Sequence, residues 1–335
     1  MDESTDLTGQ LLDLSLGYLK SAALHAAAHW RIADLLADGP RSADDLAAEA
    51  GLNGPHLARL LRYLAGQGVF RQEEDGRFAL TPLAELLRED APGSMRAYVD
   101  VRGEDIFWRA AAGMHEAVRT GGNPFEDIFG MPFYRYLSAN RELGVQFDAS
   151  MASFSEALSD EVAESYDFGG ASTVVDVGGG RGGQLRAILR RHAHLEGTLL
   201  DLEPVVAGHV LDVPELAGRW RAEGGDFFSA VPEGGDVYLL KHVLASWPDE
   251  KCVQLLEVCR RAMPDDGRLL VVNALVPEGN EPHPGKTMDM LMLTVLNGKG
   301  RTRAEYEELL RKAGLVPGRV LDVSPHASIV EATKG

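Results

Sequence analysis

The stretch VVDVGGGRGG at residues 174–183 constrains the fold of this chain more than any other feature. It begins with a short apolar run typical of a buried strand, and Gly178, Gly180 and Gly183 follow before the helical segment QLRAILRR. Glycine lets the backbone turn sharply and lets a ligand approach where a Cβ would stand in the way. A strand, a glycine turn and a helix in this order predict the ligand-binding turn of an open α/β sheet.

The sequence after Thr173 continues this alternation of strands and helices. Further strands are expected in GTLLDLE, VYLLKHV and GRLLVVNALV, with helical segments between them. Such alternation is typical of a doubly wound sheet with parallel strands. We therefore expect residues 166–335 to form one Rossmann-like α/β domain.

Residues at the ends of the expected strands predict a nucleotide-like ligand. Asp201 ends a strand about 20 residues after the glycines, where a carboxylate accepts hydrogen bonds from a ribose. Asp226, after Gly225, could accept from an adenine amino group with Phe227 against the ring, and Lys241 could meet a carboxylate. Each also has an ordinary structural role, since Gly225-Asp226 favours a turn and Lys241 could be a solvated strand end. The glycine spacing and Asp201 fit either a dinucleotide or S-adenosylmethionine.

Residues 1–100 are expected to form a separate, mostly helical domain. The segment SADDLAAEAGLNGPHLARLLRYLAGQGVF predicts helix, turn and helix with Ser42 as the N-cap, and two short strands follow around Asp75-Gly76. This order of elements predicts a winged helix-turn-helix. The preceding Leu- and Ala-rich stretch must bury broad apolar faces, and a second subunit could cover them.

A winged helix-turn-helix is compatible with either DNA binding or dimerisation. Its second helix offers His56, Arg59 and Arg62, but acidic residues surround that helix and no basic stripe is present. The net charge of −18 also opposes binding to phosphate backbones or anionic lipid. Dimerisation is therefore favoured over binding to nucleic acid or membranes.

Residues 101–165 are expected to be a helical linker. Its methionines and aromatic residues at helical spacing suit core packing, or the lining of a pocket for a large flat ligand. Cys252 and Cys259 fall on one expected helix, roughly 10 Å apart at 1.5 Å rise per residue, which is too far for a disulfide. Buried reduced thiols are expected instead.

The remaining composition favours a cytoplasmic protein. The N-terminal MDESTDLTGQ shows no secretory signal, and no apolar run reaches the roughly 20 residues that a spanning helix needs. His115, His209 and His283 are scattered and form no grouping typical of metal ligands. No metal is expected.

The complete set of motifs resembles the class I S-adenosylmethionine-dependent small-molecule O-methyltransferases of the plant caffeate and bacterial polyketide-tailoring types. The winged helix, YDFGGASTVVDVGGGRGG, LLDLEPVV, GDFF, LLKHVLASWPDEKC and GKGRTRAEYEELLRKAGL occur in the family's order over nearly the whole chain. The resemblance implies a homodimer with an N-terminal dimerisation domain. It also implies methylation of a small aromatic acceptor, a hydroxylated aromatic acid or polyketide-derived ring of secondary metabolism such as antibiotic biosynthesis, with S-adenosylhomocysteine as the second product.

The resemblance also implies the binding residues. Cofactor contacts carry over to Gly178, Gly180, Asp201, Leu202, Gly225, Asp226, Phe227, Lys241 and Trp247. The acceptor pocket is expected from the middle helices and the segment before GKGRT, at Trp108, Phe147, Met151, Met288 and Met292.

The family's catalytic base is missing from this chain. Where the family carries Leu-His-Asp-Trp, this sequence has Leu244-Ala245-Ser246-Trp247, and the two glutamates that flank the histidine in plant members are replaced by Asn273 and Gly300. The catalytic residue therefore stays unassigned. His242 is a weak candidate for a substitute base, and Asp289 for orienting a substrate hydroxyl, although a structural carboxylate is the favoured role.

Methyl transfer is still expected without a dedicated base. A positioned base typically contributes about 10²–10⁴-fold, whereas holding the reactants in line supplies effective molarities of roughly 10⁵–10⁸ M. A dry pocket also favours transfer from a sulfonium, because that step neutralises charge. O-methylation by proximity and desolvation is thus expected. The alternatives are C-methylation, a same-fold hydroxylase, decarboxylase or pericyclase that uses S-adenosylmethionine without consuming it and, more remotely, an NAD dehydrogenase.

Overall fold

The computed structural model describes residues 6–335, which divide into two compact units. The first unit holds the described residues up to Trp108 together with Ala149–Phe154, and the second holds Arg109–Asp148 and Ser155–Gly335. Residues 1–5, on which part of the expectation about a secretory signal rests, lie outside the described residues. Within residues 6–335, none of the helices is both long enough and apolar enough to cross a bilayer.

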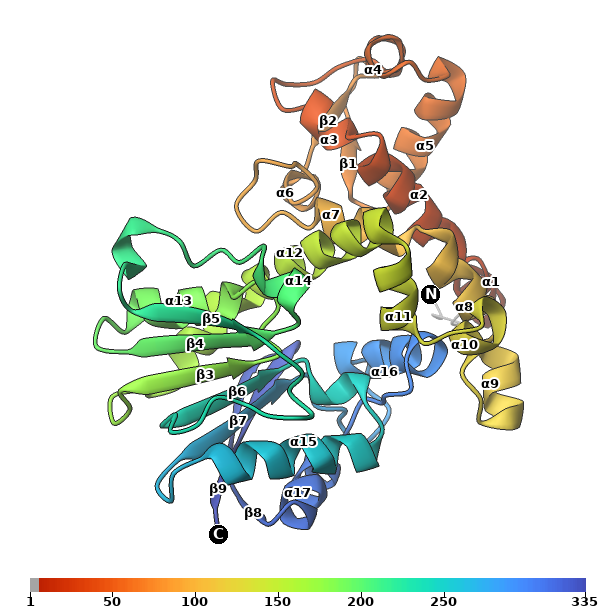
Figure 1. Cartoon of the computed structure of the whole chain (residues 1–335). Coiled ribbons are helices and arrows are strands. Elements are labelled where there is room, and N and C mark those ends of the chain that lie inside the picture. The colour runs from red at the N-terminus through yellow and green to blue at the C-terminus, as the bar shows by residue number, and fades with distance from the viewer. Residues whose placement is uncertain (1–5) are drawn as a thin grey trace, which may run out of the picture. The chain divides into compact units, whose positions relative to one another are not determined.

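The first unit carries the predicted winged helix-turn-helix (Figure 1). Its elements in chain order are α1 (Leu7–Ser15), α2 (Gly17–His29), α3 (Ile32–Leu35), α4 (Ala43–Ala50), α5 (Gly54–Gly66), β1 (Phe70–Gln72), β2 (Phe78–Leu80), α6 (Pro82–Glu85) and α7 (Arg96–Arg102), followed by the start of α8 (Asp105–Ala112). Ser42 caps α4 by accepting a hydrogen bond from the Asp45 N–H, as predicted. The wing is an antiparallel hairpin with Phe70 opposite Leu80.

The core of this unit forms because the apolar stripes of its helices face one another. Leu46 of α4, Leu57, Leu61 and Leu64 of α5, and Phe70 and Phe78 of the wing are buried together with Ile32 and Leu36. A second apolar set stays exposed along α1 and α2: Leu7, Leu11, Leu12, Leu14, Leu16, Tyr18 and Leu19. The amphipathic stretch therefore leaves part of its apolar surface uncovered within a single chain.

The second unit is built on a seven-stranded sheet with the order β5-β4-β3-β6-β7-β9-β8 (Figure 1). The strands are β3 (Thr173–Val177), β4 (Glu196–Asp201), β5 (Trp220–Gly224), β6 (Val237–Lys241), β7 (Arg268–Asn273), β8 (Leu315–Ser324) and β9 (Ala327–Lys334). Strands β3 to β7 pair in parallel, as expected. The chain crosses over between β3 and β6, and ligands of open α/β sheets bind beside such a reversal of strand order.

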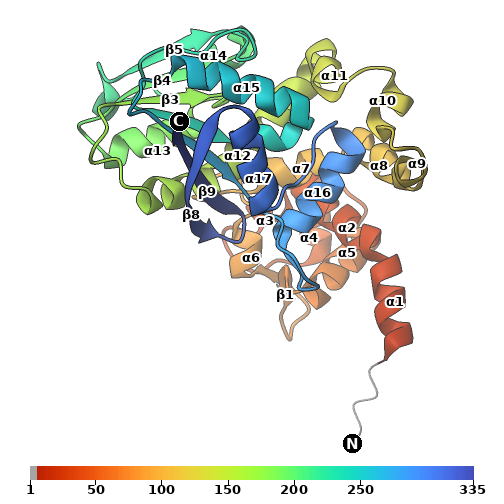
Figure 2. The same ribbon diagram turned by 90° about the horizontal axis from the view of Figure 1, so that it is seen from below.

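The predicted parallel strands are joined by two further strands that the sequence analysis did not predict. Strand β9 pairs antiparallel with both β7 and β8, and β8 contains irregular register near Pro317 and Asp322 (Figure 2). The two last strands are joined by a short turn, which permits only antiparallel pairing because a parallel pair needs a long crossover. The sheet is therefore mixed.

Helices cover both faces of the sheet, and alternate strand residues serve the two layers. Val175 and Val177 of β3 pack with Leu255 and Leu256 of α15 in one core, while Val174 belongs to the opposite core. The remaining helices are α9 (Met114–Thr120), α10 (Pro124–Phe129), α11 (Phe133–Ala139), α12 (Arg141–Ser165), α13 (Gly183–Arg191), α14 (Glu203–Val206), α15 (Asp249–Ala262), α16 (Pro284–Val295) and α17 (Arg303–Lys312), with short 3₁₀ turns η1 (Pro214–Leu216) and η2 (Leu244–Ser246).

The two cysteines are buried, reduced thiols on one helix, as the sequence predicted. Cys252 and Cys259 both lie on α15, buried and free of any disulfide. Burial raises the pKa of the Cys252 thiol to about 11 and that of Cys259 to about 12. Both are therefore protonated packing residues at neutral pH.

Candidate cofactor and acceptor site

The glycine turn after β3 leaves room where side chains would stand. Gly178, Gly180 and Gly182 all have positive φ, between 61° and 82°, which is the left-handed region that favours glycine. A Cβ on Gly178 would meet Val243 at 2.9 Å, so this glycine is required by close packing. A Cβ on Gly180 would meet no atom within 4 Å, so the space beside Gly180 is open.

Asp201 at the end of β4 ties this turn to the next strand. Its carboxylate accepts hydrogen bonds from the Gly180 N–H at 2.8 Å and the Leu202 N–H at 2.7 Å. Burial raises the pKa of Asp201, and these two N–H donors oppose that rise. The strand end thus holds a carboxylate beside the glycine turn, as the sequence predicted.

Lys241 at the end of β6 is buried rather than solvated. It is 8% exposed, and its Nζ donates to the Ser155 carbonyl and hydroxyl, both at 3.0 Å, and to the Ser159 hydroxyl at 3.2 Å. Burial lowers the pKa of Lys241 to about 7. Because the amine is shielded from water, the carboxylate of a bound ligand would stabilise its charged form strongly.

Asp176 of β3 completes this group, and the sequence analysis did not single it out. The side chain is 1% exposed, and no hydrogen bond of ordinary geometry reaches either carboxylate oxygen. Burial raises its pKa to about 7, while the Lys241 charge acts in the opposite direction and Asp201 adds to the rise. The Leu185 backbone N–H and the Lys241 charge favour the ionised form, and a buried carboxylate with so few partners is suited to an ammonium group. Its place in VVDVGGG, two positions before Gly178, is the sequence signal that could have identified it.

Asp226 and the aromatic residues after it form the other end of the site. The Asp226 carboxylate accepts from the Phe228 N–H at 2.9 Å and the Ser229 hydroxyl at 3.2 Å, which is the turn role that its sequence allowed. Phe227 contacts the Gly178 side of the turn, and its ring centroid lies 6.3 Å from that of Trp247. The strand-end residues Gly178, Asp201, Phe227, Lys241 and Trp247 all belong to the second unit.

The segment at the missing base is the 3₁₀ turn η2, and Arg301 holds it in place. This arginine is completely buried. Its guanidinium donates to the Leu244 and Trp247 carbonyls, each at 2.9 Å, and forms an ion pair with Asp249 at 2.7 Å. A Cβ on Gly298 would overlap the Ala245 carbonyl, so only glycine fits against the turn. The motif GKGRT, which the sequence analysis used to recognise the family and to locate the vacant glutamate, therefore also positions η2.

His242 lies at a strained backbone position between β6 and η2. Its φ of 58° is unusual for a residue other than glycine. The imidazole is hydrogen-bonded to the Asn273 side chain, and burial lowers the pKa of His242 to about 3. A proton on this ring is therefore strongly disfavoured, which argues against its use as the base.

The residues expected to line the acceptor pocket divide between the two units. Trp108 and Met151 belong to the first unit, and Phe147, Met288 and Met292 to the second. Phe147 is buried edge-on against Phe133, with ring centroids 5.1 Å apart. Met288 and Met292 lie on α16, which contacts α9 and α10.

Two further residues border the site in the second unit. Tyr134 of α11 stacks on Trp247 at 6.3 Å and its hydroxyl donates to Ser246 at 3.3 Å. Burial raises the pKa of Asp148, and the neighbouring Asp201 carboxylate raises it further. Neither residue carried a motif of its own, although Asp148 follows Phe147 directly.

A glycine turn, a strand-end carboxylate and a buried lysine on a doubly wound sheet define a nucleotide-binding α/β protein. The family models specify the class further. The O-methyltransferase domain matches residues 111–316, and the O-methyltransferase dimerisation domain matches residues 12–90. The chain therefore belongs to the S-adenosylmethionine-dependent O-methyltransferase family, and the resemblance seen in its motifs is confirmed.

Individual relatives agree with this assignment. The chain is 40% identical to the phenazine O-methyltransferase PhzM of Lysobacter antibioticus, over 97% of this chain and 96% of that protein. The structure of CalO1, a methyltransferase of calicheamicin biosynthesis in its SAH-bound form, superposes with a TM-score of 0.90, covers all of both chains and is 42% identical. The aclacinomycin 10-hydroxylase RdmB of Streptomyces purpurascens is 36% identical, over 93% of this chain and 86% of that protein.

The residues present fit S-adenosylmethionine, the cofactor of the family. The open space beside Gly180 admits a ligand to the backbone of the glycine turn. Asp176 and Lys241 offer the two opposite charges that the amino and carboxylate groups of the cofactor's methionine part require. The sequence-based prediction assigns Asp201 to the ribose and Phe227 to the adenine, and both residues lie beside the glycine turn.

Proposed function

We propose that this chain methylates a hydroxyl group on a small aromatic acceptor, a hydroxylated aromatic acid or a polyketide-derived ring of secondary metabolism. The observation that carries this proposal is the neutral turn η2. Arg301 and Gly298 fix its backbone firmly, yet Ala245 offers no proton acceptor where the family has its histidine. The enzyme is thus built to hold an acceptor in position rather than to deprotonate it.

The chain's own residues perform three tasks in this proposal. Gly178, Gly180, Leu202, Gly225 and Trp247 shape the backbone and apolar walls of the cofactor site, and Asp201, Asp226, Phe227 and Lys241 recognise its parts. Phe147, Met288 and Met292 contact the acceptor and exclude water. S-adenosylmethionine, when bound, supplies a methyl group on a positively charged sulfur. A water-free surrounding favours the loss of that charge during transfer.

Positioning of the reactants can compensate for the absent base, because a general base contributes less to the rate than positioning does. General-base catalysis typically contributes about 10²–10⁴-fold, while positioning contributes effective molarities of roughly 10⁵–10⁸ M. Acceptors with an acidic hydroxyl, or with an electron-rich carbon, are the best suited, because they need the least help with the proton. O-methylation is proposed first and C-methylation second.

The test is the stoichiometry of the reaction with a panel of hydroxylated aromatic acids, phenazines and polyketide rings. Methyl transfer predicts one S-adenosylhomocysteine for each product molecule, and a mass increase of one methylene in the product. The position of the new methyl group separates oxygen from carbon acceptors. A product formed while S-adenosylmethionine is left unconsumed would reject methylation.

That second outcome defines the alternative function. A relative named as a hydroxylase is 36% identical to this chain, and the vacant base position removes one residue that methyl transfer normally uses. In this alternative S-adenosylmethionine acts only through its charge, in hydroxylation, decarboxylation or pericyclic chemistry. Repeating the assay with a cationic analogue of S-adenosylmethionine that carries no transferable methyl group distinguishes the two, since product should form only if the charge alone is needed; S-adenosylhomocysteine, which lacks both the charge and the methyl group, is the negative control.

We further propose that the enzyme is a cytoplasmic homodimer, with residues 1–100 for dimerisation, residues 101–165 as a helical linker and residues 166–335 for cofactor binding. The exposed leucines of α1 and α2 and the match to a dimerisation domain support it. Light scattering after size-exclusion chromatography tests it, with a monomer mass as the contrary result. Leu11→Glu with Leu14→Glu should shift the mass toward monomer.

A further inference from the structure

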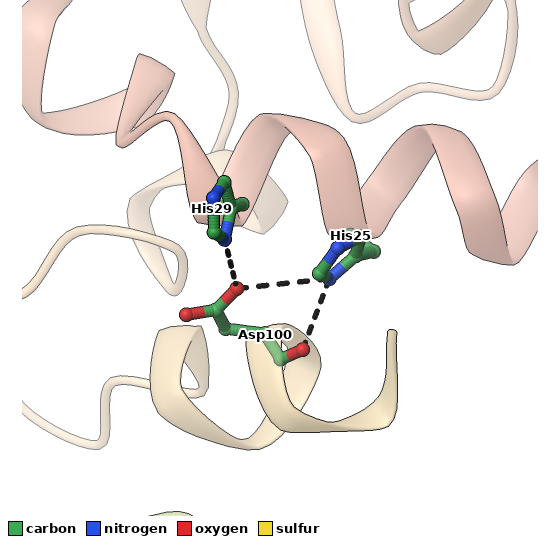
Figure 3. Close-up of side chains that lie close together, drawn as sticks. All are labelled: His25, His29 and Asp100. Atoms are coloured by element: carbon green, nitrogen blue, oxygen red, sulfur yellow. Dashed lines mark hydrogen bonds and ion pairs between the residues drawn. The ribbon is translucent and has the colours of Figure 1, made fainter. Parts of the chain in front are cut away.

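Helices α2 and α7 of the first unit bring two histidines and an aspartate together (Figure 3). His25 and His29 lie one helical turn apart on α2 and face Asp100 of α7. The Asp100 Oδ1 atom is 3.1 Å from His29 Nδ1 and 3.6 Å from His25 Nδ1. Among the described residues, this is the only group of three or more His, Cys, Asp or Glu side chains with the geometry of a metal site.

We propose that His25, His29 and Asp100 bind a divalent transition-metal ion, of which Zn²⁺ is the best match. Zinc binds imidazole nitrogen and carboxylate oxygen at roughly 2.0–2.2 Å, so neighbouring ligand atoms around a tetrahedral ion lie about 3.3–3.6 Å apart. The two nitrogen–oxygen separations, 3.1 and 3.6 Å, lie close to this range. Three protein ligands of this type leave a fourth position for water.

The surroundings of the three side chains support this assignment. A Cβ on Gly103, just after α7, would lie 1.9 Å from His25 Nδ1. The φ of Gly103 is −84°, which any residue adopts, so it is the imidazole that requires glycine here. The other carboxylate oxygen of Asp100 lies 3.9 Å from the Arg96 guanidinium. A cation on that oxygen directs Oδ1 toward the histidines, as outer partners of metal ligands do.

Access to the group is open. The side chains of His25, His29 and Asp100 are 25%, 48% and 31% exposed, so an ion can enter and keep a water ligand. The competing arrangement is a plain hydrogen-bond cluster, because His25 Nδ1 lies 2.9 Å from the Asp100 carbonyl and His29 Nδ1 3.1 Å from its carboxylate. A bound ion takes the place of the hydrogen on each of these Nδ1 atoms and links α2 to α7. Neutral imidazoles are required, so protons compete with the ion.

The experiment is a zinc titration of the full-length, tag-free protein against a chromogenic chelator. We expect one ion per chain, and an affinity lowered more than about tenfold in both His25→Gln and His29→Gln. His115→Gln is the matched control, since His115 is an exposed helical histidine beside a single glutamate. Its affinity should stay within about twofold of the original protein.

A second measurement locates the ion. Crystals soaked in Zn²⁺ should show an anomalous peak bounded by His25, His29 and Asp100. Circular dichroism confirms that the variants are folded, and the more exposed His29 gives the variant with least effect on packing. The proposal is overturned if the protein binds no stoichiometric zinc, if the two variants bind like the control, or if the peak lies elsewhere.

Discussion

The Asp289 carboxylate accepts a hydrogen bond from the backbone N–H of Gly300 at 2.7 Å. Gly300 stands where the resemblance places one of the family's glutamates. A Cβ there would lie 2.8 Å from Val276 and 2.9 Å from the Asp289 Cβ, so Asp289 on α16 and Val276 occupy the space that a side chain at 300 would need. Asp289 thus has the structural role that the sequence analysis favoured, and the glutamate cannot be restored by one substitution.

The first prediction concerns this position. Gly300→Glu should lower the free energy of unfolding by about 1–3 kcal/mol through overpacking, and it should not raise turnover. Gly170→Glu is the control, because Gly170 is exposed and a Cβ there meets no atom within 4 Å. Chemical denaturation and initial rates measure the two effects. A turnover increase above tenfold in Gly300→Glu would show that the missing glutamate limits the reaction.

The second prediction tests orientation at the vacant base position. Ala245→Ser should leave turnover within about tenfold of the original enzyme, which is below the usual contribution of a general base. The small hydroxyl fits this partly exposed position and supplies no strong proton acceptor. Initial rates at saturating S-adenosylmethionine measure it. A hundredfold loss would contradict a mechanism based on positioning.

His242 provides the third prediction. His242→Asn should keep most of the activity, because asparagine tolerates the positive φ of 58° and the histidine is too poor a proton acceptor to act as the base. Turnover and S-adenosylhomocysteine affinity are measured together. A loss of about 10³-fold in turnover with unchanged affinity would identify His242 as the base after all.

Much of this site could be predicted because strand ends and glycine turns leave local signals in sequence. Asp201 and Lys241 follow short continuous apolar runs, and Gly178 and Gly180 need a backbone that other residues rarely adopt. Arg301 could not be predicted to hold η2, because its partners lie more than 50 residues away in sequence. The antiparallel strand β8 was missed because Pro317 and Gly318 interrupt its pattern. The group at His25 and Asp100 joins segments 75 residues apart.

The fourth prediction concerns Arg301. Arg301→Lys should lower the free energy of unfolding by about 2–4 kcal/mol, because lysine cannot donate to the Leu244 and Trp247 carbonyls and to Asp249 at once. Turnover should fall as well, since η2 loses its support. Arg303→Lys is the control, as Arg303 is exposed and pairs only with Glu307 among the described residues. Its effect should stay within about 0.5 kcal/mol. Equal effects of the two variants would reject a positioning role for Arg301.

The last prediction uses the buried carboxyl of Asp176. Burial raises its pKa from 3.8 in the unfolded chain to about 7 in the folded chain. Between these two pH values the unfolded chain has released the proton while the folded chain retains it, so rising pH favours unfolding. Below 3.8 both states are protonated, and above about 7 both are ionised, so the effect ends at those limits.

Asp176→Asn removes this penalty, because the amide stays neutral. Without cofactor, the variant should be more stable than the original protein by an amount that grows from about pH 4 to about pH 7 and then levels off. Its affinity for S-adenosylhomocysteine should fall roughly 10- to 150-fold, as expected when a charged hydrogen-bond acceptor is lost. Urea denaturation at several pH values and calorimetry measure the two changes, with the exposed Asp212→Asn as control. If Asp176 binds the cofactor's ammonium group, its carboxylate should lower the stability of the cofactor-free protein and also raise the affinity for the cofactor. A variant that loses stability at every pH, or that keeps full affinity, would assign Asp176 to the core of the sheet alone.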